Sequence, residues 1–323
     1  MLILYLAQSA LPLALIGWLA FFPPRSAAGF WAQSIAIGLT LLALNFVGIW
    51  IVPPWWTPDA LGALLAAAVV GGIARRRAST QWPHGILAWL TFLGFVALGI
   101  YAANVTRIAY AATVTPARTV DLASPLATGS YFVANCGAAL SVNAHAELLD
   151  QTVAKHRPYW GTAHGVDIVA LDRWYLRADG LMPADPRRYV IFGRSVIAPC
   201  SGKVIVAVDG LPDMQVPRFD SAHLAGNHLI LRCASADILL GHFRRGSVHV
   251  RVGQSVIVGE AIGQVGNSGN TSEPHLHINP QAPATADAPF SGAPIPIRIN
   301  GRYLVRNDRF DAQSTGHEGS GQP

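Results

Sequence analysis

The sequence predicts an α + β protein in two parts: an N-terminal bundle of transmembrane helices, then an all-β antiparallel barrel or sandwich. Two observations predict this fold class. Of the 323 residues, 51% are apolar and 13% are charged, which is unlike an ordinary soluble domain. Long charge-free runs are confined to the first third, and the remainder breaks into short strand-like segments punctuated by Gly, Pro, Asp and Asn.

The first third contains three long runs without a charged side chain, at residues 1–24, 26–58 and 85–106. Each run exceeds the roughly 20 residues that a helix needs to cross a bilayer. A shorter apolar stretch at 60–74 becomes long enough when Trp55 and Trp56 are counted as interfacial anchors. We therefore expect about four transmembrane helices, at 2–22, 30–52, 57–74 and 85–106.

Charged residues in the loops predict the orientation of these helices. Arginines 75–77 follow the third expected helix and Arg25 follows the first, whereas the loop at 53–59 contains no base. Because basic loops stay on the cytoplasmic side, we expect the C-terminal domain on the outer side. The charge-free runs indicate an anchor in the lipid bilayer rather than an ion path. No basic tract is present, so nucleic acid is not an expected partner.

Downstream of the helices we expect a linker at 107–128, a folded domain at 129–305 and a disordered tail at 306–323. The tail is small and polar, as is typical of disorder. Alternating apolar residues between turn residues predict short strands within the domain. These strands are expected at 131–134, 166–170, 189–192, 204–208, 228–231, 238–240, 248–250 and 261–265.

The segment Pro274-His275-Leu276-His277-Ile278 is the most informative motif for chemistry. Alternate side chains of an extended strand share a face, so His275 and His277 are expected to project together. Leu276 and Ile278 are expected to point into the core. Two imidazoles at this spacing can serve one site, although a single His-x-His triplet is a weak signal on its own.

The surroundings of this triplet resemble the lysostaphin-like (LytM-type) zinc metallopeptidases, in a divergent form. A Gly-rich loop from Gly263 leads into the triplet, as in the closing signature of that family. Four further segments match family elements in order: His164-Gly-Val-Asp167-Ile, Ile197-Ala-Pro-Cys-Ser-Gly-Lys-Val, Gly226-Asn227-His-Leu-Ile and Leu239-Leu-Gly-His242-Phe.

The resemblance implies a small antiparallel β-fold of the LytM type that binds Zn²⁺ and hydrolyses peptide bonds of bacterial peptidoglycan. By the resemblance, Asp167 and His277 are metal ligands. His242 and His275 are the implied catalytic residues, one as a general base and the other as support for the oxyanion. A bacterial cytoplasmic (inner) membrane location follows, with the domain periplasmic or otherwise extracytoplasmic. Peptidoglycan peptide and the bilayer are the expected partners, and the sequence identifies no protein partner.

The third metal ligand is open between His145 and His164. The family usually spaces the His and Asp of its first motif four apart, whereas His164 and Asp167 are three apart. In a straight strand this spacing places two side chains on opposite faces. His145 lies in Ser141-Val-Asn143-Ala-His145, which resembles an Asn-x-His element of a divergent branch of the family. We favour His145 and keep His164 as the alternative.

Other interpretations remain open at this point. The irregular first motif also fits a catalytically degenerate domain that binds cell wall or regulates another hydrolase. A His phosphocarrier or carrier-type sandwich shares the glycine pattern at 252–266, but such domains work in the cytoplasm. The three cysteines, Cys136, Cys200 and Cys233, form no metal or redox motif. Cys200 and Cys233 are the favoured disulfide pair, and small buried apolar residues are the equal alternative.

Overall fold

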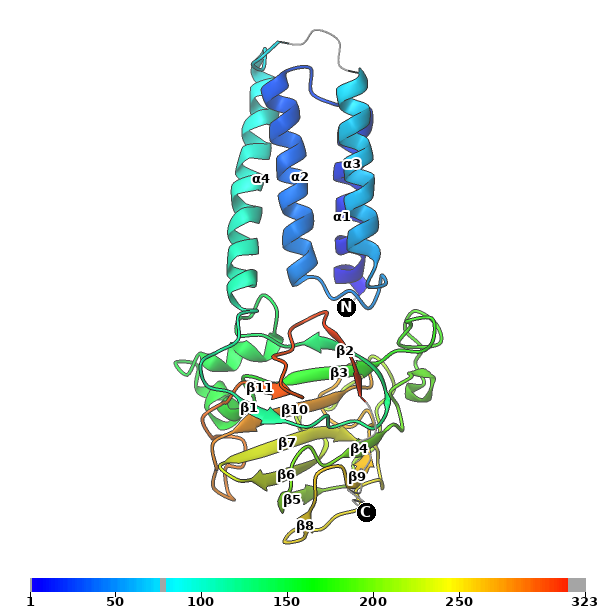
Figure 1. The fold of residues 1–323 in the computed structure, drawn as a ribbon, viewed down its shortest axis with the longest axis vertical. Helices are drawn as coiled ribbons and strands as arrows, with labels where there is room; N and C mark the ends of the chain where they lie inside the picture. The colour runs from blue at the N-terminus through cyan, green and yellow to red at the C-terminus, as the bar shows by residue number, and fades with distance from the viewer. Residues whose placement is uncertain (1, 76–79, 313–323) are drawn as a thin grey trace, which may run out of the picture. The chain divides into compact units, whose positions relative to one another are not determined.

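The structure is a computed structural model that describes residues 2–75 and 80–312. The chain divides into two compact units, Met1–Val114 and Thr115–Pro323. Figure 1 shows that the first unit is helical and the second is built mainly of strands. The helices of the first unit are α1 (Leu2–Phe21), α2 (Ala27–Val47), α3 (Thr57–Arg75) and α4 (Ile86–Ala111).

Three of these helices, α2, α3 and α4, are long and apolar enough to cross a membrane. The expectation of about four spanning helices is therefore corrected to three, although a helix forms at each of the four expected places. The apolar stretch found in the described part of α1, Gln8–Phe21, is shorter than those of α2, α3 and α4.

Small residues allow the helices of the first unit to approach closely. The ring of Phe30 on α2 packs against Gly72 on α3, where a Cβ would lie 2.6 Å from the ring. On α4, Gly99 faces Ala36 of α2, and a Cβ there would lie 3.5 Å from the Ala36 Cα. Such contacts are typical of membrane helices, which associate through van der Waals packing rather than through the hydrophobic effect. Phe30 and Ile37 are fully buried at the centre of this bundle.

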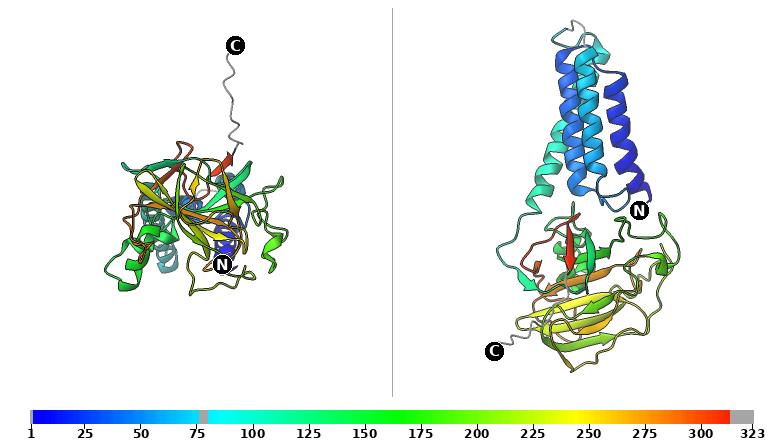
Figure 2. Two further views of the ribbon diagram at one scale, coloured as in Figure 1. Left: turned by 90° about the horizontal axis from the view of Figure 1, so that it is seen from below. Right: turned by 45° about the vertical axis from the view of Figure 1, so that its right-hand side comes forward.

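The second unit is organised around an eight-stranded sheet in the order β12-β2-β3-β10-β7-β6-β5-β8, and its long strands are visible in both views of Figure 2. All pairs in this sheet are antiparallel. Its strands are β2 (Gly129–Asn135), β3 (Val166–Ala170), β5 (Gly202–Val208), β6 (Asn227–Cys233), β7 (Ala236–Phe243), β8 (Ser255–Val256), β10 (Leu276–Gln281) and β12 (Arg309–Ala312).

Two small sheets complete the domain. In one, β4 (Ser195–Ile197) pairs with β9 (Ala261–Gln264) in antiparallel fashion. In the other, β1 (Val120–Leu122) pairs in parallel with β11 (Ile297–Ile299). Apolar side chains from the strands form one continuous core, which includes Leu229, Leu231 and Leu240.

The antiparallel domain expected from the sequence is present, but two details of the expectation are wrong. The main sheet is open, with β12 and β8 at its edges, so a closed barrel is not shown. The expected strands at 189–192 and 248–250 are absent from the strands of the described chain. Residues 189–192 follow a short 3₁₀ turn at Pro186–Arg188 and bury Ile191 without joining a ladder. A buried apolar run alone does not distinguish these structures.

The ends of the second unit are tied into its sheets. Within the segment expected to be a linker, Val120–Leu122 form β1, and within the expected tail, Arg309–Ala312 form β12. The pairing of β12 with β2 places Phe310 opposite Tyr131, and their rings lie 5.5 Å apart. The rest of the expected tail, residues 313–323, lies outside the described residues.

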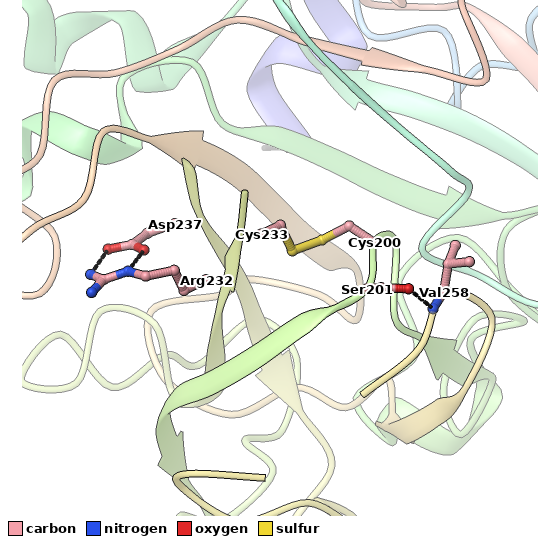
Figure 3. Close-up of a disulfide and its surroundings, with 6 residues drawn as sticks. All are labelled: Cys200, Ser201, Arg232, Cys233, Asp237 and Val258. Carbon is pink, nitrogen blue, oxygen red and sulfur yellow. Dashed lines mark hydrogen bonds and ion pairs between the residues drawn. A yellow bond between two sulfur atoms is a disulfide. The ribbon is translucent and has the colours of Figure 1, made fainter. Parts of the chain in front are cut away.

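Cys200 and Cys233 form a disulfide, and Cys136 is a buried free thiol. Figure 3 shows the disulfide connecting the segment before β5 to the end of β6. Beside it, Arg232 forms a two-pronged ion pair with Asp237, whose carboxylate is 1% exposed. Ser201 accepts a hydrogen bond from the amide of Val258. The favoured pairing of the cysteines is therefore the one found.

Candidate metal centre

The register of the main sheet places Asp167 and His277 side by side. His277 of β10 lies directly opposite Asp167 of β3 in the antiparallel ladder. Asn135 of β2 lies opposite Asp167 on its other side, and Gly241 of β7 lies opposite His277. Directly opposed residues of neighbouring strands share a face of the sheet. Four strands thus form one polar row with the carboxylate near its middle.

The opposite face of the same strands anchors this row in the apolar core. Leu276 and Ile278 are fully buried and belong to the core, as the alternation in the sequence predicts. Val166 and Ile168 of β3 are likewise fully buried and belong to the core. A shift of one residue in this register would expose these four side chains and bury the polar row, so the core fixes the position of Asp167 and His277.

His145 reaches the row from a separate element, the 3₁₀ turn η1 (Ala144–Leu149). The Asn143 side chain accepts a hydrogen bond from the His145 amide at the start of this turn. Its Nδ2 also donates to the carbonyls of Gly137 and Gly165, each at 3.1 Å. Asn143 is fully buried. It therefore fastens the turn to the residues immediately before β3.

His145, Asp167 and His277 converge so that one ligand atom from each lies within 4.8 Å of the others. Nε2 of His145 lies 3.0 and 3.1 Å from the two oxygens of Asp167. Nδ1 of His277 lies 2.9 Å from Asp167 Oδ1. The Asp167 side chain is 9% exposed and that of His145 is 26% exposed. The group is therefore anchored in the sheet and open to solvent on the side of His145.

Asn279 fixes the orientation of the His277 ring. Its Nδ2 donates to the Gly161 carbonyl at 2.9 Å, so its Oδ1 accepts from Nε2 of His277, also at 2.9 Å. Burial lowers the pKa of His277, which favours the neutral ring with a lone pair on Nδ1. That lone pair faces the Asp167 carboxylate, so two acceptors meet at 2.9 Å. A cation between them would remove this repulsion.

The donor set therefore fits a metal ion of the zinc type. Zinc prefers imidazole nitrogen and carboxylate oxygen, and catalytic sites use three protein ligands with one position open. Two imidazoles and one carboxylate supply that number here. Burial alone would raise the pKa of Asp167, but His145 and His275 hold it well below its ordinary value. The carboxylate is thus ionised, as a metal ligand must be.

His242 and His275 lie next to this group. Their ring centroids are 4.7 Å apart, and the His242 ring is 6.0 Å from that of His277. Nδ1 of His242 donates to the Ser268 carbonyl at 2.8 Å, and Nδ1 of His275 donates to the Glu273 carbonyl at 2.9 Å. Both rings therefore direct Nε2 away from these carbonyls, and Nε2 of His275 lies 3.5 Å from Asp167 Oδ1. Burial lowers the pKa of His242 well below its usual range, so that ring is neutral near pH 7.

An irregularity in β7 brings His242 to the site. His242 has a φ of 65°, and the register of β6 with β7 shifts between Asn227 and Leu229. Such a bulge re-aims a side chain that strict alternation would send to the other face. The neighbouring Phe243 stays fully buried in the core. The sequence contains no signal for this bulge except the glycine at 241.

His164 is not part of the convergent group among the described residues. It precedes β3, and burial lowers its pKa. The structure thus brings together five of the six side chains singled out in the sequence: His145, Asp167, His242, His275 and His277. The irregular spacing of His164 and Asp167 has no bearing on a group that uses His145.

Sequence reasoning missed several supporting residues, including Asn279. Asn135 donates from Nδ2 to Asp167 Oδ2 at 2.9 Å, and Arg306 donates from Nη2 to Asn135 Oδ1 at 2.6 Å. Burial lowers the pKa of Arg306 to about 10. At Gly165 a Cβ would lie 2.4 Å from the His277 ring and 2.9 Å from the His145 ring. Asn135 and Arg306 are 171 residues apart, and nothing in a single sequence indicates that contact.

Residues 190–286 match the family model described as peptidase family M23. The matched segment contains His242, His275 and His277, and the predicted resemblance is confirmed over that segment. A comparison with curated proteins gave no match.

Solved structures of M23 peptidases are similar to parts of the chain. The catalytic domain of the antimicrobial peptidase lysostaphin from Staphylococcus simulans is 22% identical, with 39% of this chain and 71% of that chain covered and a TM-score of 0.26. A putative peptidase M23 from Pseudomonas aeruginosa is 25% identical (38% and 50% covered, TM-score 0.23). A zinc containing peptidase from Vibrio cholerae is 20% identical (46% and 48% covered, TM-score 0.23). This chain therefore spans about half the length of the latter two.

Proposed function

We propose that the protein is a membrane-anchored, zinc-dependent endopeptidase that hydrolyses peptide bonds of bacterial peptidoglycan. The observation that carries the proposal is the convergence of His145, Asp167 and His277, with the His277 lone pair directed at the carboxylate. The match to peptidase family M23 supports the reaction class. When bound, zinc supplies a Lewis acid that polarises a peptide carbonyl and lowers the pKa of water.

The roles of His242 and His275 follow from their hydrogen bonds. Each ring is held through Nδ1 by a backbone carbonyl, which leaves Nε2, beside Asp167 in the case of His275, to exchange a proton with a group next to the three ligands. One ring accepts a proton from the attacking water. The other donates a hydrogen bond to the oxygen on which negative charge develops. The Arg177–Glu273 ion pair, with an N–O distance of 2.8 Å, steadies the segment that positions His275.

The disulfide and the charged loops support an extracytoplasmic domain. Structural disulfides persist in oxidising compartments such as the periplasm and are rare in the cytosol. The Cys200–Cys233 pair therefore suits a domain on the outer side of a bacterial cytoplasmic membrane. The arginines at 75–77 follow α3 and, by the positive-inside rule, give the same orientation. In that location peptidoglycan peptide is the available substrate.

Zinc content and hydrolysis, measured on the same full-length preparations in detergent, test this proposal. We expect about one zinc per chain in the unaltered protein, and less than roughly 0.1 equivalent in His277→Ala. His242→Ala should keep its zinc and release soluble peptidoglycan fragments at least about 100-fold more slowly, because it removes a proton-transfer group without removing a ligand.

Two outcomes would contradict the proposal. Hydrolysis by zinc-free protein would remove the metal from the reaction. Full zinc occupancy without release of peptidoglycan fragments would favour the catalytically degenerate domain that binds cell wall or regulates another hydrolase.

A further inference from the structure

The helical unit contains a cavity of about 940 Å³ at the ends of the helices that flank the loops at 22–26 and 80–85. The helices of this unit appear at the top of Figure 1. Much of the cavity wall is apolar and includes Trp18 of α1 and Phe92 and Phe95 of α4. Polar side chains also line it: Arg25, Ser26, Gln33, Arg75, Thr80, His84 and Thr91.

Gln33 is the most unusual of these residues. It lies in α2 and is completely buried, yet neither its amide nitrogen nor its amide oxygen has a hydrogen-bond partner. A buried amide without a partner is costly, and native proteins nearly always satisfy such groups. Because Gln33 lines the cavity, a ligand with hydrogen-bonding groups at that depth would supply the missing partners.

The cavity lining is positively charged. Arg25 and Arg75 both line it, and Arg75 Nη2 is held by a hydrogen bond of 2.7 Å to the Ala20 carbonyl. Helix α4 begins at the same place, and its N-cap Gly85 provides no side-chain cap. The positive end of its dipole and its first amides therefore favour an anion. Among the described residues no acidic side chain lines the cavity.

The arginines and Gln33 lie at different depths in the cavity, and this separation indicates the kind of ligand. Gln33 lies six residues beyond the start of α2, or about 9 Å along the helix. A phosphate between Arg25 and Arg75 would place the glycerol and ester groups of a phospholipid near Gln33. The acyl chains would then pass along the aromatic wall. A free phosphate would satisfy the arginines but would leave Gln33 and the apolar surface uncovered.

We propose that this cavity binds the headgroup and glycerol backbone of an anionic phospholipid. The lipid phosphate pairs with Arg25 and Arg75 at the N-terminal end of α4, and an ester or hydroxyl group bonds to Gln33. The site lies within the helical unit and does not depend on any activity of the C-terminal domain. It makes the anchor a selective lipid-binding element.

Native mass spectrometry of the full-length protein in detergent tests the proposal. The protein is titrated with phosphatidylglycerol and with phosphatidylcholine of the same acyl chains. We expect at least about tenfold tighter binding of the anionic lipid. Each arginine near a lipid surface contributes about a fivefold change in affinity. The double variant R25Q with R75Q should therefore weaken binding of the anionic lipid about 25-fold. Q33L should weaken binding and raise the melting temperature without lipid, because the unpartnered amide is gone.

The matched control is R107Q, which removes an arginine of α4 about 30 Å along the helix from Leu87. Arg107 is exposed and does not line the cavity. The R107Q variant should bind lipid like the unaltered protein.

Equal binding of both lipids, or an equal loss of binding in R107Q, would overturn the proposal in favour of general surface charge. Displacement of the lipid by millimolar inorganic phosphate would overturn it in favour of a free-anion site. A size-exclusion profile like that of the unaltered protein, with a melting temperature that is no lower, excludes misfolding as the cause of weaker binding.

Discussion

Asp167 is the residue on which the candidate site depends, because its carboxylate contacts three histidines and one asparagine: His145, His275, His277 and Asn135. His277 and Asn135 reach it through the register of β10 and β2. His145 reaches it through the turn that Asn143 caps. The close approach of the two imidazoles requires glycine at position 165, where a Cβ would collide with the ring of His277.

Separate alanine substitutions of His145 and of His164 distinguish the two candidates for the third ligand. His145→Ala removes a nitrogen that lies 3.0 Å from Asp167 and should lower zinc affinity at least about 100-fold. His164→Ala is the matched control and should leave zinc affinity within about twofold, because His164 is outside the convergent group. Competition with a chromogenic chelator measures both. The opposite order of the two affinities would make His164 the ligand.

The sequence could predict part of this site in advance. Alternation in an extended strand is a local rule, so the burial of Leu276 and Ile278 followed directly from the His-x-His triplet. The same rule argued against pairing His164 with Asp167. The support from Asn135 and Arg306 could not be predicted, because it depends on β2, β3 and a loop that are distant in sequence.

At the level of elements, the disulfide joins the end of β6 to the segment before β5. Cys200 and Cys233 are 33 residues apart. In the chain-entropy model a bridge of that loop length stabilises a domain by about 3–4 kcal/mol. Arg232 and Asp237 join β6 to its other neighbour, β7, through a two-pronged ion pair.

We therefore expect Cys200→Ser with Cys233→Ser to lower the free energy of unfolding by about 3 kcal/mol. Urea unfolding, monitored by tryptophan fluorescence, measures this free energy. Cys136→Ser serves as the control for the loss of a sulfur, since Cys136 is buried and unpaired with another cysteine. A double variant as stable as the unaltered protein would show that the bridge does not constrain the unfolded chain.

Strands were predicted best where both faces of the sheet impose a pattern. Residues 166–170 coincide with β3, and the expected segments at 204–208 and 228–231 lie within β5 and β6. The segments at 189–192 and 248–250 failed because apolar side chains can be buried from turns and irregular chain as well. The three-residue strands β1 and β11 pair with each other across 177 positions, from Val120 to Ile297, which local patterns do not reveal.

At the scale of the whole molecule, the orientation of the C-terminal domain depends on the loop between α3 and α4. The arginines at 75–77 precede α4, so the positive-inside rule predicts that α4 alone carries the chain from the cytoplasmic to the outer side. This orientation is the same whether α1 spans the membrane or not. The correction from four spanning helices to three therefore leaves the expected side of the domain unchanged.

Reporter fusions test that orientation in bacterial cells. Alkaline phosphatase, which needs an oxidising compartment to fold, should be active when fused after Val114 and inactive when fused after Arg75. The difference should be at least about tenfold if the positive-inside rule governs these helices. Activity in the reverse pattern would place the domain in the cytoplasm and revive the carrier-type interpretation of its glycine-rich segment.

X-ray absorption at the zinc edge, on the purified full-length protein, tests the central claim most directly. The account predicts a first shell of nitrogen and oxygen at about 2.0–2.2 Å, with the signature of two imidazoles that falls to one in His145→Ala. A shell containing sulfur, at about 2.3 Å, would contradict it. So would a spectrum that is unchanged when His145 or His277 is replaced.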